Sequence, residues 1–186
     1  MKKITAILCT LFTLSTFTHS LIAHSSDIIS SQDVTHSLGK ISKEGTLIAI
    51  EDESQWIIPE SDSYISSKWH LGDVLVITPN SSYFAYFSNY TYTLSNLSTG
   101  TSTVANLYYG PRINGALTKQ VTETNFTDGD VTLSDGSSWR VSTHSEKDFS
   151  NWQVSDYVIV GTSNYANKNI LINVNLNQYI ESINFN

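Results

Sequence analysis

The aromatic side chains of segment 83–92 are the strongest binding candidates in this sequence. The segment reads YFAYFSNYTY and carries six aromatic rings in ten residues. Tyrosine combines an apolar ring with a hydroxyl group, and such rings are enriched where proteins meet their partners. We therefore expect Tyr83, Tyr86, Tyr90 and Tyr92 to form a binding patch for a protein or a glycan at the cell surface.

The same segment has the pattern of a β-strand. Successive side chains of a strand point to opposite faces, so Phe84 and Tyr86 share one face while Tyr83 and Phe87 share the other. A small barrel buries only one of these faces. The other face packs against a second domain as a seam, binds a partner or inserts into a membrane, and the sequence alone leaves these three uses open.

The carboxylates and histidines form no recognisable catalytic or metal-binding motif. Asp128-Gly129-Asp130 resembles the start of a calcium loop, but Thr132 and Trp139 stand where an EF-hand needs oxygen ligands. The tripeptide Glu51-Asp52-Glu53 is typical of a solvated turn. No zinc-protease, nucleophile-elbow or P-loop string occurs. We expect no catalytic residue, no metal and no cofactor, with a hydrolase site between two domains as the less favoured alternative.

The charge balance argues against two classes of partner. The chain has 186 residues, with 10 Lys and Arg against 17 Asp and Glu, and a formal net charge of −7. A protein that binds nucleic acid needs a basic surface to neutralise phosphates, and so does one that binds anionic membranes. We therefore expect no nucleic-acid partner, and the composition says nothing of the oligomeric state.

Residues 1–23 have the pattern of a secretory signal peptide. Met1-Lys2-Lys3 is cationic, and the apolar stretch 4–17 that follows is too short to span a membrane. We expect cleavage after Ala23 or three residues earlier, with an uncleaved N-terminal anchor as the alternative. The only cysteine, Cys9, lies in this segment, so the mature protein would have no thiol and no disulfide. The sequence predicts a secreted or periplasmic bacterial protein with no membrane span after cleavage.

The rest of the chain contains an internal duplication. Residues 50–77 align without a gap on residues 133–160, at a spacing of 83. Six aligned pairs are identical: Asp52/Asp135, Ser54/Ser137, Trp56/Trp139, Ser67/Ser150, Trp69/Trp152 and Asp73/Asp156. All four tryptophans belong to these pairs, which chance explains poorly. Because both copies keep them, we expect the tryptophans in the core and the aspartates of the last pair in turns.

Each copy has the strand pattern of a small barrel. Short runs rich in β-branched residues predict strands at 47–50, 56–58, 74–77, 83–87, 90–94 and 103–108, and again at 131–133, 139–141, 157–160, 170–174 and 179–185. Helical periodicity is absent, except for a turn near residues 64–67 or 146–149. Asp135-Gly136 predicts a two-residue hairpin, and because Glu53 replaces the glycine we expect a different turn in the first copy.

These elements predict an all-β protein of two tandem small barrels, SH3-like or OB-like, with a single β-sandwich or barrel as the alternative. The predicted domains are the signal peptide 1–23, an extended N-terminal arm 24–44, a first barrel 45–109, a linker 110–115 and a second barrel 116–186.

Two stretches resemble a repeat of uncharacterised secreted bacterial proteins with duplicated SH3-like barrels. That repeat reads D-G-S-x-W-x-[IV], a spacer, then W-x-x-G-D-x-V. Here it is carried by the stretches 135–141 (DGSSWRV) and 69–74 (WHLGDV), with departures at Glu53 and Ser155. The resemblance implies the barrel fold and no particular activity. We therefore expect a non-catalytic binding or surface-structural module that uses the aromatic patch of its first barrel, with a cell-wall glycan-binding protein as the alternative.

Overall fold

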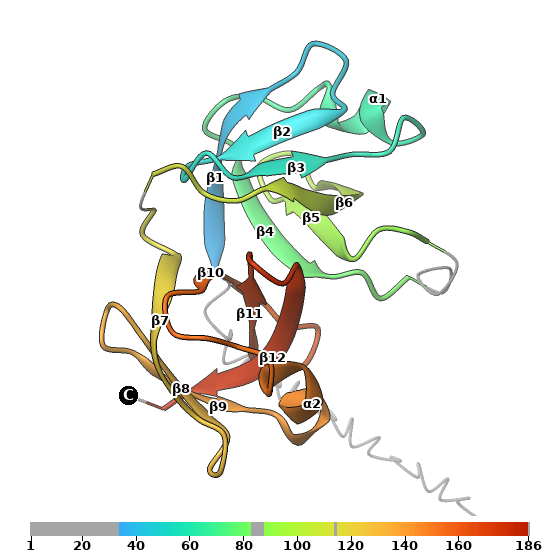
Figure 1. Ribbon diagram of the computed structural model, residues 1–186. Coiled ribbons are helices and arrows are strands. Elements are labelled where there is room, and N and C mark those ends of the chain that lie inside the picture. The colour runs from blue at the N-terminus through green and yellow to red at the C-terminus, as the bar shows by residue number, and fades with distance from the viewer. Residues whose placement is uncertain (1–33, 83–87, 114, 186) are drawn as a thin grey trace, which may run out of the picture.

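The short strands of each copy form a closed barrel. The computed structural model describes residues 34–82, 88–113 and 115–185, and in this part of the chain the strands form two closed antiparallel barrels of six strands each. Two tandem small barrels were predicted and are confirmed, and a single sandwich or barrel is excluded. Figure 1 shows the first barrel (blue to green) stacked on the second (yellow to red).

The first barrel closes in the order β1-β2-β3-β6-β5-β4. Its elements are β1 (Thr35–Ile41), β2 (Leu47–Ile50), β3 (Gln55–Ile57), α1 (Ser63–Ser66), β4 (Val74–Pro79), β5 (Tyr92–Asn96) and β6 (Thr101–Tyr109).

The second barrel closes in the order β10-β11-β12-β9-β8-β7. Its elements are β7 (Thr118–Asn125), β8 (Asp130–Leu133), β9 (Ser138–Val141), the 3-10 turn η2 (Thr143–Ser145), α2 (Glu146–Phe149), β10 (Tyr157–Thr162), β11 (Asn169–Asn173) and β12 (Gln178–Asn184). The two short helices lie where the sequence predicts a helical turn.

The duplication extends over both whole barrels. Elements β1 to β4 match β7 to β10 at the spacing of 83 residues, and β5 and β6 match β11 and β12 at a spacing of 77. The spacing changes because the connection between β4 and β5 (residues 80–91) is six residues longer than the connection between β10 and β11 (residues 163–168). The aromatic segment therefore lies largely in an insertion that the second barrel lacks.

The first barrel begins earlier than the sequence predicts. Strand β1, inside the expected N-terminal arm, pairs with both β2 and β4 and so closes the barrel. Its buried residues are His36 and Leu38, which alternate with exposed polar residues. A strand with a histidine, a glycine and a lysine among seven residues has little β-branched character, so its pairing partners decide its structure. Strand β7 was missed for a different reason: its β-branched residues are interspersed with charged and amide side chains, and Val121 is its only buried apolar residue.

The recurring Asp-x-Ser-x-Trp stretch forms the same turn in both barrels. Ser54 N donates to Asp52 Oδ1 at 2.8 Å, and Trp56 Nε1 donates to Ser54 Oγ at 3.1 Å. The equivalent bonds from Ser137 and Trp139 measure 3.1 and 2.8 Å. All four tryptophans are buried, as expected, at 0 to 6% exposure. The expected difference in turn type is wrong: Glu53 has φ 62°, close to the 84° of Gly136, because the same capping bonds hold both turns.

Asp73 and Asp156 also have the predicted turn role. Asp73 Oδ2 accepts bonds from His70 N at 2.9 Å and Asn96 Nδ2 at 2.6 Å. Asp156 Oδ2 accepts the equivalent bonds from Gln153 N and Asn173 Nδ2, at 2.9 and 2.7 Å.

The two barrels share one apolar cluster. Ile159, Ile170 and Ile172 of the second barrel belong to the buried cluster of the first, which also contains Ile77 and Tyr92. Polar bonds cross the seam as well. His36 Nε2 donates to Val160 O at 2.9 Å, and Asn164 Nδ2 donates to Pro79 O at 2.9 Å.

The expected linker 110–115 is held against the first barrel. Asp52 O accepts bonds from Arg112 N at 2.9 Å and Ile113 N at 3.2 Å, and Thr118 Oγ1, at the start of β7, donates to Asp52 Oδ2. The predicted signal peptide and the predicted strand 83–87 lie outside the described residues.

Candidate functional site

The predicted aromatic patch divides into parts with different environments. Tyr83 and Tyr86 lie outside the described residues, and Tyr90 is half-buried. Tyr92, at the start of β5, is 0% exposed. Its ring packs edge-on against Trp56, with centroids 5.4 Å apart, and against Tyr179 of the second barrel at 5.9 Å. Tyr92 thus belongs to the core and the seam between the barrels, and a partner cannot reach it.

The ends of the aromatic connection are pinned to the first barrel. Asn80 N donates to Thr91 O and Asn80 Nδ2 donates to Tyr90 O, both at 2.9 Å. On the other side, Asn106 of β6 donates to Asn89 O at 2.6 Å and accepts from Thr91 N at 2.8 Å. These four bonds hold the described ends of the connection, residues 80 and 89–91, against each other and against β6.

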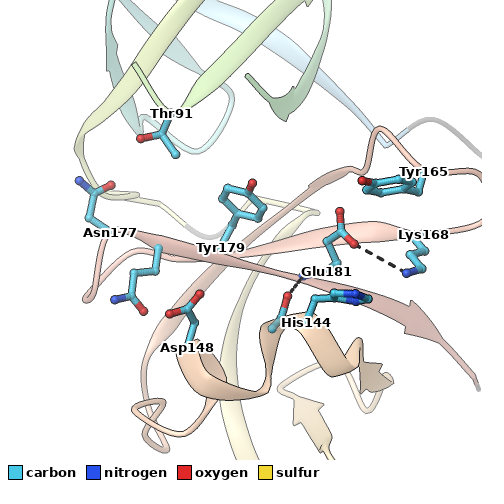
Figure 2. Close-up of a pocket in the computed structure, with 10 residues that line it drawn as sticks. Thr91, His144, Asp148, Tyr165, Lys168, Asn177, Tyr179 and Glu181 are labelled. Atoms are coloured by element: carbon cyan, nitrogen blue, oxygen red, sulfur yellow. Dashed lines mark hydrogen bonds and ion pairs between the residues drawn. The ribbon is translucent and has the colours of Figure 1, made fainter. Parts of the chain in front are cut away.

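A cleft of about 610 Å³ opens between this connection and the second barrel. Thr91 contributes from the first barrel, and all other lining side chains come from η2, α2, β12 and the loops around β11. The lining residues are Thr91, His144, Ser145, Asp148, Tyr165, Lys168, Asn177, Gln178, Tyr179 and Glu181. Figure 2 shows Thr91 on the side opposite His144 and Asp148, with Tyr179 and Glu181 between them.

The charged groups of the cleft are partly paired. Lys168 Nζ lies 3.7 Å from Glu181 Oε2, and Ser163 Oγ donates to Glu181 Oε1 at 3.2 Å. The Lys168 ammonium also lies over the Tyr165 ring, 5.7 Å from its centroid. Asp148 forms no ion pair with any described residue. The cleft therefore carries one carboxylate more than its cations neutralise.

Two tyrosines give the cleft apolar surface. Tyr165 is 65% exposed, while Tyr179 is half-buried with its ring against Tyr92. Burial raises the pKa of the Tyr179 hydroxyl, and the negative charges of Glu181 and Asp148 raise it further. Tyr179 is therefore a neutral hydrogen-bond donor at physiological pH.

The cleft thus offers two aromatic rings, two amides, two carboxylates, an ammonium and an imidazole. Aromatic faces beside amide and carboxylate groups suit a ligand with both apolar CH surface and many hydroxyls. A sugar has this combination.

A second cleft, of about 910 Å³, lies on the other side of the seam between β1, β7 and β9. Its ionisable groups are already paired with one another. His36 Nδ1 lies 2.8 Å from Glu51 Oε1, and Lys119 Nζ lies 3.3 Å from Asp135 Oδ2. Burial raises the pKa of Glu51, but the bonds to His36 and to Ser37 N outweigh it, so that the pKa lies below its ordinary value. The basic members of the two pairs, His36 and Lys119, occupy equivalent positions of the two barrels. Because each is already paired with a carboxylate, we assign both pairs a structural role.

No group of three or more His, Cys, Asp or Glu residues in the described ranges could hold a metal ion. Likewise, no helix in the described part of the chain has the length and apolar character needed to cross a membrane.

Sequence reasoning missed most of this cleft. His144, Asp148, Tyr165, Lys168 and Glu181 lie far from the aromatic segment along the chain, and only the docking of the barrels brings them near Thr91. The available signal was the divergence of the copies: Asp148 stands where the first barrel has Ile65, and Tyr179 where it has Ser102.

Comparison of the chain with protein-family models, with curated proteins and with solved structures finds no match.

Proposed function

We propose that this protein is a secreted or periplasmic, non-catalytic binding module whose ligand is a cell-surface glycan. The ligand surface is the cleft between the barrels together with the neighbouring aromatic connection. Tyr83 and Tyr86 belong to that connection, and Tyr90 is at its anchored end.

One observation carries this proposal. The cleft combines the exposed Tyr165 ring and the half-buried Tyr179 ring with amide and carboxylate groups, directly beside the pinned end of the aromatic connection at Thr91. Sugar rings pack their CH faces on aromatic rings and place their hydroxyls on such polar groups.

Export is supported by the N-terminal sequence. The cationic Met1-Lys2-Lys3 and the apolar stretch 4–17 fit a signal peptide. The remainder of the chain has no cysteine, and a cell-surface binder without disulfides depends on its two apolar cores for stability.

A hydrolase is the second candidate, favoured by one observation. His144, Asp148 and Glu181 line the same cleft between the barrels, and glycoside hydrolysis uses a pair of carboxylates. The Glu181 carboxylate is occupied by Lys168 and Ser163, which favours a binding role.

The test is a pull-down of the full-length mature protein on insoluble peptidoglycan and chitin. Wild type is expected in the pellet, and Tyr165→Ala should lower the retained fraction several-fold because an exposed stacking ring is lost. Tyr108→Ala is the matched control, since Tyr108 is similarly exposed and lines neither cleft. Wild type that stays in the supernatant with both polymers overturns the glycan proposal.

The same samples separate the two candidates. Binding without release of reducing ends supports the binding module. Release that disappears in Glu181→Gln and Asp148→Asn would instead identify a hydrolase.

A further inference from the structure

The cleft residues of the second barrel have counterparts in the first. The groove between a short helix and the last strand of the barrel occurs twice, beside α2 and β12 and beside α1 and β6. Three lining positions correspond: Asp148 to Ile65, Gln178 to Thr101 and Tyr179 to Ser102. The duplication therefore left a groove beside the short helix in each barrel, and three of its lining positions are equivalent.

The groove of the first barrel also has a volume of about 610 Å³, but its chemistry differs. It is lined by Tyr64, Ile65, Lys68, Trp69, Thr99, Thr101 and Ser102. Apolar groups form its floor, hydroxyl groups form one rim, and Lys68 supplies its only charge.

Tyr64 is the exposed ring of this groove, at 63% exposure, and the Lys68 ammonium lies 5.8 Å from its ring centroid. Below it, Trp69 Nε1 donates to Thr101 Oγ1 at 2.8 Å, and Thr101 Oγ1 lies 2.8 Å from Thr99 Oγ1. These bonds hold the Trp69 ring and the two threonine hydroxyls in place. Tyr64 lies in α1 and Lys68 lies two residues beyond its end, and the contact of the ammonium with the ring keeps both on the same side of the groove.

We propose that this groove is a second sugar site, for an N-acetylated amino sugar, and this rests on the proposed glycan-binding function. A pyranose ring packs on Tyr64, its acetamido methyl contacts the apolar floor at Ile65 and Trp69, and its acetamido carbonyl accepts a hydrogen bond from Lys68. The apolar floor is the reason for an acetylated sugar, because an unacetylated one would bury hydroxyls there without partners. In the second barrel Asp148 replaces Ile65, which gives that groove a carboxylate that can accept a hydrogen bond from a sugar hydroxyl.

Two sites in one chain would strengthen attachment to a polymer. Binding at the second site becomes intramolecular once the first is filled, and overall attachment then exceeds that of either site alone. This is a use for retaining both copies of the groove after duplication.

The test is an NMR titration of the ¹⁵N-labelled mature protein with chitotriose, with cellotriose as the unacetylated control. We expect chitotriose to shift the amides of residues 64–69 and 99–102. Tyr64→Ala should weaken this binding roughly tenfold, and Lys68→Met should weaken it with the ring intact. An otherwise unchanged spectrum of each variant shows that the fold is kept.

Two groups of amides, those of the Tyr64 groove and those of the cleft near residues 165 and 179, distinguish a failure of the second site from a failure of the proposed function. Shifts confined to the cleft residues near 165 and 179 overturn the second site and leave the function standing. Shifts confined to the Tyr64 groove support the second site and overturn the cleft as the main ligand surface. Equal shifts with cellotriose overturn the acetamido assignment, and no shift with either sugar overturns both proposals.

Discussion

At the scale of single residues, the turns show how the two copies tolerate different sequences. Gly72 and Ser155 are equivalent, and both have positive φ, 86° and 78°. Their backbone amides make the same 2.8 Å bonds, Gly72 N to Leu38 O and Ser155 N to Val121 O. A residue with a Cβ is strained in this region by about 1–2 kcal/mol. The surrounding bonds hold Ser155 there against that strain.

Ser155→Gly should therefore stabilise the protein. We expect the free energy of unfolding to rise by about 0.5–1 kcal/mol, because the relief of strain exceeds the extra backbone entropy of glycine in the unfolded chain. Urea denaturation measures the change. Gly72→Ser is the reciprocal variant and should lower stability by a similar amount. No atom lies within 4 Å of an added Cβ, so the backbone strain at positive φ is the only cost of the substitution. Equal stability of all three proteins would contradict this explanation.

At the scale of elements, one carboxylate adds side-chain bonds to β1, whose backbone is paired with β2 and β4. Glu51, just after β2, binds His36 Nδ1 at 2.8 Å and Ser37 N at 2.9 Å, and His36 in turn reaches Val160 of the second barrel. The ionised Glu51 thus strengthens the attachment of β1 beyond its backbone pairing.

Glu51→Gln should change how stability depends on pH. The pKa of Glu51 is lowered from its ordinary value of 4.5 in the folded protein, so its contribution is complete above pH 4.5 and is lost as the pH falls through the lowered folded value. We expect the variant to lose about 1 kcal/mol at pH 7 and a smaller amount at pH 3. Urea midpoints at both pH values provide the measurement. A constant difference between the two proteins at both pH values would show that Glu51 does not carry this dependence.

At the scale of the whole molecule, the two barrels are joined by a shared apolar cluster and a close backbone approach. A Cβ on Gly161 of β10 would lie 2.8 Å from Ile77 O of β4. The absence of a side chain at this position lets the barrels meet, and the cleft with Thr91 exists only because they do.

Gly161→Ala should weaken the coupling between the unfolding of the two barrels. Wild type is expected to unfold in a single calorimetric transition, because one cluster contains residues of both barrels. The added methyl should lower stability by about 1–3 kcal/mol and broaden or split the transition. Scanning calorimetry gives both quantities. A variant with wild-type melting temperature and one sharp transition would mean that the seam adapts without cost.

Much of the fold could be predicted because its signals are local. The paired tryptophans, the Asp-x-Ser-x-Trp turn and the helical turns at α1 and α2 each depend on residues close together in the sequence. Strand β1 and strand β7 could not be found this way, because each has few apolar residues to mark a buried face, and the strands that pair with them complete their structure.

The candidate site could not be predicted from local signals. Tyr92 was grouped with Tyr83, Tyr86 and Tyr90 because they are neighbours in sequence, yet its side chain packs between Trp56 and Tyr179. Position along a strand determines which residues share a face, but which face is covered depends on what packs against it.

The sequence by itself determined that the chain is a duplication of one small β unit, since repeated residue types at constant spacing need no structure to be recognised. Only the tertiary structure decided where a ligand could bind. The two clefts lie at the contact between the barrels, and the residues that line them come from segments up to 150 residues apart, Val34 and Asn184 in the second cleft, which side-chain packing across the seam brings together.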